Sequence, residues 1–418
     1  MQAPSLSNKR ISWCQRDWGD WVTPKLLSEE PIYRWFVFPH SFSGAIVEFF
    51  INKWNLKKGS SILDPFVGAG TTMVAAARHG INGLGVDISP LAVLVSNVKV
   101  CDYDHELVTS WKRLRLLLTT VGPATPYSDS AFSRRAFSAR SLSVLEQIRD
   151  VIHSIPVLAH RNFFLLALVQ ILAGLSRAKR SGGWLRWQHR GGDAATIIPR
   201  FEAQVELMLN DIGSSERPVP RGKCEARLAD ARGLVTRQKF DALITSPPYP
   251  NRHDYSRIFN VELAFAFLGD SAIKTLRHES FRSHVEAQTP QHDLREYVQI
   301  PELERAIAKI EKRAIDRRIP RMLRGYFQDL YLTLRSSRAC LKPSAPLALI
   351  VGNVRYNGVT VPVDTGVARI ALSLGYSFEQ VMVARYRGNS AQQMGQYGRL
   401  PMRESVVLLR NTSESQCH

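Results

Sequence analysis

A rigid proline pair follows an apolar run in the second half of the chain. The stretch FDALITSPPY spans residues 240–249, and Ser246 directly precedes Pro247 and Pro248. Each proline fixes its own φ angle, lacks an N–H and keeps the preceding residue extended. The carbonyl groups therefore point outward, and Tyr249 adds an aromatic ring. Such an array can accept hydrogen bonds from the N–H2 group of a planar molecule. A plain proline-rich loop explains the same residues.

A carboxylate and a glycine loop follow another apolar run. Asp64 begins the loop of SSILDPFVGAGTT, and Gly68 and Gly70 allow a backbone to approach a ligand closely. The helix that follows offers unpaired N–H groups, which Thr71 can supplement, so the loop suits a carboxylate or a phosphate. It lacks the Gly-Lys-Ser/Thr ending of a Walker loop and the third glycine of a dinucleotide fingerprint. A simple tight turn is the alternative.

Two more carboxylates end later apolar runs. Asp87 in GLGVDISP precedes Ser89 and Pro90, which are typical of a helix N-cap and first helical residue. An Asp at this place can accept hydrogen bonds from the hydroxyls of a ribose, or it can cap the helix. Asp230 in ADAR follows a third run.

Strand-like runs and helical segments alternate through much of the chain. This pattern predicts an α/β fold, a Rossmann-like, doubly wound and mainly parallel sheet of seven strands, with the last pair as candidates for an antiparallel arrangement. Ligands bind beyond the carboxyl ends of the strands in such a sheet. We therefore expect the three carboxylates and Ser246 to meet at one edge.

Two long, mostly helical stretches interrupt the alternation, at 103–222 and 252–320. The sheet-forming parts would then be 1–102, 223–251 and 321–418. The first stretch contains a loop rich in Gly, Trp, Arg and Lys and is the candidate target-recognition region.

The composition favours a polyanionic partner. The 418 residues include 55 Lys and Arg against 37 Asp and Glu, which gives a formal net charge of +18. Nucleic acid is the expected partner, although a protein that is merely basic and soluble has the same composition. The five cysteines are scattered without a C-x-x-C pair, so we expect a reduced, cytoplasmic protein and no metal. The apolar stretch at 163–175 is too short to cross a membrane and predicts a buried helix.

These motifs together resemble one known family. DPFVGAGTT, GVDISP, ADAR and FDALITSPPY are similar to the motifs of the S-adenosylmethionine-dependent DNA amino-methyltransferases. The resemblance covers roughly 33–100, 224–260 and 321–411. The cofactor motif precedes the catalytic one, whereas many SPPY enzymes have the reverse order. Ser at the first motif position is typical of the N4-cytosine enzymes, while Asp or Asn is commoner among N6-adenine enzymes.

The resemblance implies a role for each motif. Asp87 would bind the ribose of S-adenosylmethionine, Asp230 would lie near its adenine, and the segment at 38–50 would help to cover its methionine. Glycine-loop residues would hold the methionine part of the cofactor: Asp64, Phe66, Gly68, Gly70 and Thr71. The catalytic residues would be Ser246, Pro247, Pro248 and Tyr249.

An exocyclic amine is a poor nucleophile because its lone pair is delocalised into the ring. Ser246 and the carbonyl of Pro247 would accept its two hydrogens, and Tyr249 would stack on a base flipped out of the duplex. We therefore predict a cytosine-N4 methyltransferase acting on double-stranded DNA, with a cognate restriction endonuclease as a possible partner. The alternatives are an N6-adenine or RNA base methyltransferase, and an inactive nucleic-acid-binding module of this fold.

Basic residues of the first insertion are candidates for phosphate contacts. Trp184 and Trp187 lie among them and are candidates for stacking on DNA or for burial against the inserted helices. Asp254, just after the proline motif, fits a helix cap. The predicted DNA-binding residues are Arg177, Lys179, Arg180, Arg186 and Arg190.

Overall fold

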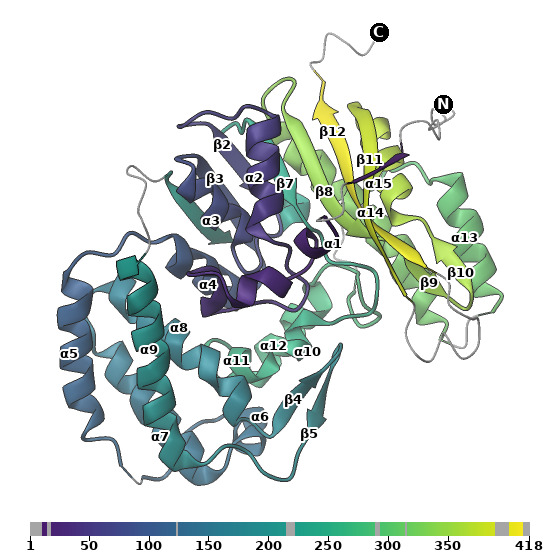
Figure 1. The fold of residues 1–418 in the computed structure, drawn as a ribbon. Coiled ribbons are helices and arrows are strands. Elements are labelled where there is room, and N and C mark those ends of the chain that lie inside the picture. The colour runs from purple at the N-terminus through teal and green to yellow at the C-terminus, as the bar shows by residue number, and fades with distance from the viewer. Residues whose placement is uncertain are drawn as a thin grey trace.

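The computed structural model describes residues 11–14, 18–122, 124–214, 222–288, 293–313, 316–388 and 401–412. Its centre is one large sheet (Figure 1). The strands of this sheet are β1 (Ile11–Trp13), β2 (Ser61–Asp64), β3 (Asn82–Asp87), β6 (Cys224–Leu228), β7 (Ala242–Thr245), β8 (Pro346–Gly352), β11 (Tyr376–Arg387) and β12 (Met402–Asn411). They lie in the order β1-β11-β12-β8-β7-β2-β3-β6.

The strand directions are those of a doubly wound sheet. Neighbours from β6 to β8 are parallel, while β12 runs antiparallel to both β8 and β11. The order reverses between β2 and β7, which is where a ligand site is expected in such a fold. The predicted Rossmann-like class and the antiparallel element at the end are therefore confirmed.

The sequence predicts seven strands in the large sheet, and the described residues form eight. The eighth strand, β1, pairs in parallel with Val381–Val383 of β11. Its three residues are too few to show an alternating pattern that identifies a strand. Its partner, β11, also lies more than 350 positions later in the chain, so no local signal indicates the pairing.

Alternating side chains of the central strands fill two cores. Ile62, Ile244 and Ile350 face α2 (Gly44–Lys53) and α3 (Thr71–Arg78). Leu63, Leu243 and Leu349 face the opposite way, in a core that includes α14 (Arg318–Cys340) and α15 (Val363–Ser373). Strands covered on both faces are apolar throughout, which explains why β2, β7 and β8 have fully buried residues at every position.

The first inserted stretch forms a helical unit beside the sheet, and α4 (Pro90–Val100) joins the two (Figure 1). The helices of this unit are α5 (Glu106–Leu118), α6 (Ala131–Ala136), α7 (Ala139–His153), α8 (Leu158–Leu175) and α9 (Ile197–Ser214). The segment expected to be a loop is instead an antiparallel hairpin of β4 (Ala178–Ser181) and β5 (Trp184–Trp187). Gly182 and Gly183 form its turn, with a φ of 59° at Gly182.

The stretch at 163–175 is expected from the sequence to be too short to cross a membrane, but it belongs to a longer helix, α8. The helix has 18 residues with a mean hydropathy of 1.5, and by length and composition alone it is sufficient to cross a membrane. More than half of it is buried inside the protein, where it packs on α7 and α9. The helix is thus a core element of the inserted unit, so the predicted buried helix is confirmed although the length argument for it was wrong.

The second inserted stretch is divided between the two sides of the molecule. It contains α10 (Tyr255–Ile258), α11 (Asn260–Ala266), α12 (Asp270–Glu279) and α13 (Pro301–Glu311). Helix α11 packs on α6 and α8 and shares their hydrophobic core, while α13 packs on α14. A short hairpin of β9 (Val354–Tyr356) and β10 (Val359–Val361) follows β8.

Candidate functional site

A pocket lies at the carboxyl ends of β2, β3 and β7, where the strand order reverses. Segments far apart in the chain supply its wall. The predicted site residues that line it are Phe66, Gly68, Thr71, Asp87, Asp230, Ser246, Pro247, Pro248 and Tyr249. Asp64 and Gly70 lie next to it but do not line it. The cofactor motif at 64–72 and the proline motif at 246–249 therefore share one cavity, although more than 170 residues separate them in the sequence.

Asp64 holds the glycine loop and β7 together. Its side chain is buried, and its Oδ1 accepts hydrogen bonds from the Phe66 N–H at 3.0 Å and the Thr245 hydroxyl at 2.6 Å. Burial raises the pKa of this carboxyl to about 6. Asp64 therefore acts from beneath the pocket, on the residues that line it.

Asp87 is held by two backbone hydrogen bonds next to the start of α4, while its role in binding a ribose stays a prediction. Its Oδ1 accepts the Ser89 N–H at 2.9 Å, and its Oδ2 accepts the Gly68 N–H at 3.2 Å. Ser89 and Pro90 are the N-cap and first residue of α4, as predicted, although the Ser89 hydroxyl makes no capping hydrogen bond. Asp87 also lines the pocket, and each of its oxygens has a further lone pair. Burial raises its pKa to about 6.

The two loop glycines serve different purposes. Both have positive φ angles, 47° at Gly68 and 79° at Gly70. A Cβ atom at Gly68 would meet nothing closer than 3.7 Å, whereas at Gly70 it would lie 2.9 Å from the Cα of Ser96 in α4. Gly68 thus leaves open space beside the pocket, and Gly70 allows the glycine loop and α4 to pack closely. The buried Lys99 ammonium donates to the Ala69 carbonyl at 3.0 Å, and burial lowers its pKa to about 7.

Two hydrogen bonds fix the proline motif to the strand beside it and to the hairpin that follows. The Ser246 hydroxyl donates to the Ile350 carbonyl at 3.1 Å, and the buried Tyr356 hydroxyl donates to the Pro250 carbonyl at 2.6 Å. The Ser246 oxygen keeps lone pairs that can accept a hydrogen bond. The Tyr249 ring lies against Gly352, with the Arg387 guanidinium 5.7 Å from its centroid. Burial raises the pKa of Tyr249 above its usual range.

The segment preceding α2 also reaches the pocket. The sequence placed a covering helix at 38–50, but the lining side chains, Phe38, His40, Ser41 and Phe42, come from the loop before Gly44. The His40 ring stacks on His253 with 4.6 Å between centroids, and burial lowers the His40 pKa to about 4. The pair therefore provides flat, uncharged surface at neutral pH.

Several pocket residues come from the second insertion, whose role the sequence left open. They are Tyr255, Ser256, Phe259, Leu263, Leu276, Ser280, Phe281, Ser283 and His284. Of the three residues that lie just after the proline motif and are candidates for the pocket wall, His253, Asp254 and Tyr255, only Tyr255 lines the pocket. Asp254 caps α10 through the Arg257 N–H, as predicted.

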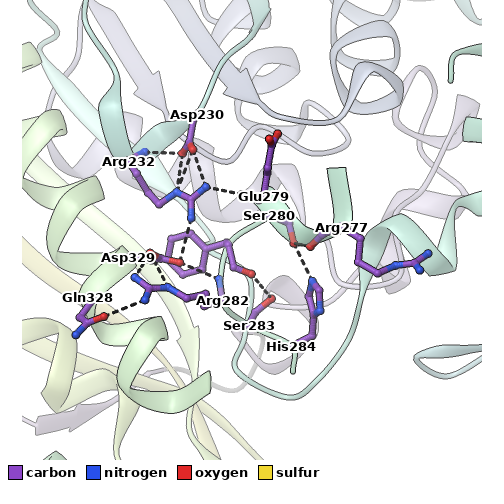
Figure 2. A network of polar contacts seen from close by, with 11 residues as sticks. Asp230, Arg232, Arg277, Glu279, Ser280, Arg282, Ser283, His284, Gln328 and Asp329 are labelled. Carbon is purple, nitrogen blue, oxygen red and sulfur yellow. Dashed lines mark hydrogen bonds and ion pairs between the residues drawn. The ribbon is translucent and has the colours of Figure 1, made fainter. Parts of the chain in front are cut away.

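A buried network of charged side chains ties this insertion to the pocket (Figure 2). Arg232 donates to both carboxylate oxygens of Asp230, from Nη2 to Oδ2 at 2.7 Å and from Nε to Oδ1 at 3.0 Å, and its Nη1 lies 3.4 Å from Asp329. Asp329, in α14, also accepts the Arg282 N–H at 2.8 Å and its Nε at 3.0 Å. Asp329 has no exposed surface. One carboxylate therefore joins the wall at 229–232 to the wall at 280–284.

The predicted DNA-binding residues fall into two groups. Arg186 and Arg190 are exposed. Lys179 instead donates to the carbonyls of Ala173 and Gly174 at the end of α8, Arg180 forms an ion pair with the buried Glu262, and Arg177 is only partly exposed. The contacts of Lys179 and Arg180 are internal because the hairpin folds back on α8 and α11. Arg318 and Arg324, in α14, also pair with nearby carboxylates.

Comparison with known proteins identifies relatives along most of the chain. A family described as DNA methylase matches residues 4–97. The type II methyltransferase M.AvaI of Nostoc sp. is 29% identical over 91% of this chain and 86% of its own length. The type II methyltransferase M.BsoBI of Geobacillus stearothermophilus is 28% identical over 91% of this chain and 85% of its own length.

Solved structures with a similar outline include an rRNA methyltransferase, aviRa, from Streptomyces viridochromogenes. It is 12% identical, covers 95% of this chain and 94% of its own, and has a TM-score of 0.30. Because this score is low, the fold assignment rests on the strand order given above.

The pocket fits the cofactor of this family. The carboxylate of Asp87 lies at a strand end, Gly68 leaves room for close approach, and the first turn of α3 contributes Thr71 to the wall. The matched DNA methylase family and the type II methyltransferases above identify the chain as a DNA amino-methyltransferase, a family that uses S-adenosylmethionine as its cofactor.

Proposed function

We propose that this protein methylates the N4 amine of cytosine in double-stranded DNA, on a base flipped out of the helix. The observation that carries the proposal is the position of Ser246. It is the first residue of an SPPY motif and lies in the same pocket as the carboxylate of Asp87. Ser at this position is typical of the N4-cytosine branch that the motif resembles.

The residues of the proline motif have distinct parts in this reaction. The Ser246 oxygen and the Pro247 carbonyl accept hydrogen bonds from the target amine, which localises its lone pair for attack. Tyr249 and the stacked ring of His40 offer flat surfaces to a base. The cofactor, when bound, supplies a methyl group on a sulfonium. No covalent bond from the protein to the base is needed, because the nucleophile is the amine itself.

The named relatives suggest the biological setting. M.AvaI and M.BsoBI are both described as type II methyltransferases, and this chain aligns with most of the length of each. We infer that the protein modifies DNA in a restriction-modification or defence system. A cognate endonuclease would then be its partner in the cell.

Product analysis tests the proposal. The purified protein is incubated with host genomic DNA from a strain lacking it and with S-adenosylmethionine carrying a deuterated methyl group. The DNA is digested to nucleosides for mass spectrometry, and we expect labelled N4-methylcytosine. Ser246→Ala is the control for contaminating activity and should give far less label.

Other products would contradict different parts of the proposal. Labelled N6-methyladenine would overturn the choice of base but keep amine methylation. Labelled 5-methylcytosine would overturn both, because methylation at carbon needs a covalent nucleophile that the motif does not supply. Label found in RNA and not in DNA would overturn the substrate.

A further inference from the structure

The β4–β5 hairpin extends from the helical unit toward α10, beside the catalytic pocket (Figure 1). At its turn, a Cβ atom on Gly183 would lie 2.3 Å from the His253 ring, so backbone and ring are in direct contact. His253 in turn stacks on His40, which lines the pocket. The tip of the hairpin therefore lies two side-chain contacts from the cavity that receives the base.

The hairpin is held firmly in this position. Arg180 in β4 forms an ion pair with the buried Glu262, and its guanidinium lies 4.6 Å from the centroid of the Phe259 ring. Its Nε also donates to the Ile258 carbonyl at 3.3 Å. These partners belong to α10, α11 and the residue between them, and Phe259 lines the pocket. A fixed hairpin requires little ordering when a ligand binds.

The two tryptophans of the hairpin have different surroundings. Trp187 packs on Phe132 and under the Arg135 guanidinium, 3.9 Å from its ring centroid. Trp184 at the tip is 54% exposed, and the Arg257 guanidinium lies 4.9 Å from its ring centroid. Trp187 is thus a packing residue. Trp184 presents a large aromatic surface to solvent, next to a cation.

We propose that Trp184 inserts into duplex DNA beside the target base pair and stacks in the space that the flipped base leaves. This inference rests on the proposed function, because it requires a base to enter the neighbouring pocket. Duplex DNA is the partner we choose because the chain carries a net charge of +18 and Arg186 and Arg190 lie exposed just after the tip. Aromatic and apolar wedges lower the cost of unstacking a base by occupying its place.

The test compares paired and unpaired targets. Two duplexes carry the recognition sequence, found by sequencing modified bases in host DNA, and differ only in whether the target base is paired or mismatched. We expect Trp184→Ala to lower kcat/KM on the paired duplex by roughly 10- to 100-fold, as for removal of an aromatic ring that stacks on a base. The decrease should be much smaller on the mismatched duplex, because there the base is already unpaired. Trp184→Phe should keep most of the activity.

A second readout does not depend on catalysis. Stacking on bases should quench the fluorescence of Trp184, so the wild type should lose more emission on binding the paired duplex than Trp184→Phe does. Trp13→Ala is the matched control, because Trp13 is 65% exposed and lies on β1 at the far edge of the sheet. It should behave as the wild type in both assays.

The outcomes separate this inference from the proposed function. If the wild type methylates the DNA but Trp184→Ala is equally active on the paired duplex, or equally impaired on both duplexes, the hairpin does not act as a wedge. If the wild type modifies no duplex DNA at all, the proposed function is wrong, and the role of Trp184 that rests on it is wrong as well. Unchanged DNA handling with loss of a protein partner would assign Trp184 to a protein interface and overturn the proposal.

Discussion

The Thr245 hydroxyl donates a 2.6 Å hydrogen bond to the Asp64 carboxylate, although the two residues are 181 positions apart. Thr245 ends β7 and directly precedes Ser246, while Asp64 ends β2 and begins the glycine loop. The bond crosses the place where the strand order reverses. It fixes the glycine loop after β2 relative to the proline motif that begins at Ser246.

Removing this donor should loosen both loops. Thr245→Val leaves the buried Asp64 carboxylate with one hydrogen bond fewer, so we expect unfolding free energy to fall by about 1–3 kcal/mol and cofactor binding to weaken. Thr245→Ser keeps the hydroxyl and should retain most of both properties. Urea unfolding and calorimetry measure the two effects. Equal behaviour of the Val and Ser variants would mean that the bond has no such role.

Cofactor affinity should depend on the protonation of Asp87. Asp87→Asn should weaken S-adenosylmethionine binding by about 1.5–3 kcal/mol, because the variant can no longer form hydrogen bonds through a charged group. Since burial raises the Asp87 pKa to about 6, the carboxylate takes up a proton as the pH falls below 6. Wild-type affinity should therefore decrease from pH 7 to pH 5, and the Asn variant should show a smaller decrease. Calorimetry measures both affinities. If the affinity of the wild type and that of the Asn variant depend on pH in the same way, Asp87 has only a structural role.

Ser246 should affect turnover far more than cofactor binding. Ser246→Ala removes one acceptor for the amine, so we expect kcat to fall by roughly 10²–10³-fold. Cofactor affinity should stay within a few-fold, because the Ser246 hydroxyl donates to the Ile350 carbonyl on the neighbouring strand and not to a residue of the glycine loop. Single-turnover kinetics and calorimetry separate the effects. A parallel loss of affinity would place Ser246 in the cofactor site.

Asp329 does not line the pocket, but its substitution should raise the KM for the cofactor. Asp329→Asn breaks the ion pairs with Arg232 and Arg282 that shape two walls of the pocket, so we expect KM to rise about tenfold or more while kcat changes little. Asp364→Asn is the matched control, since this buried carboxylate binds Arg403 and Ser405 away from the pocket.

Both variants should lose a few kcal/mol of stability, as is usual when a buried ion pair is broken. Steady-state kinetics at a temperature where both are folded then isolates the pocket effect. If the Asp364 variant raises KM as much as the Asp329 variant, general destabilisation explains the result.

The exposed arginines after the hairpin tip should account for part of the salt dependence of DNA binding. Neutralising Arg186 and Arg190 together should weaken binding to every sequence and reduce the log-log salt slope by about 2, because each arginine that binds a phosphate contributes about one unit. Lys57→Ala with Lys58→Ala is the control, because these exposed lysines precede β2 at the end of the sheet away from the pocket. An unchanged slope in the arginine variant would exclude phosphate contacts there.

The sequence predicts the sheet well because local signals coincide there. Continuous apolar runs mark β2, β7 and β8, and the glycine loop and Ser89-Pro90 mark the starts of α3 and α4. The order of these runs leads directly to a doubly wound fold. The same signals bring the cofactor and proline motifs to one pocket.

The rest depends on partners that are far apart in the chain. Arg232 and Asp329 are 97 residues apart, and nothing local indicates that one binds the other. Arg180 looked like a free cation because its partner, Glu262, lies in the second insertion. The sequence predicts a loop in place of the β4–β5 hairpin, although Gly182-Gly183 is a typical two-residue turn, because the two strands lack a clear polar and apolar alternation.

The short strand β1 has a consequence for the solubility of the protein. An uncovered β11 would present a row of unpaired backbone groups, which is a common starting point for aggregation between copies. Ile11–Trp13 occupies this edge, and Trp13 packs on Tyr386 with 4.9 Å between ring centroids. A version of the protein shortened to begin at Trp18 should therefore keep its pocket but self-associate, which sedimentation of the truncated and full-length chains would reveal.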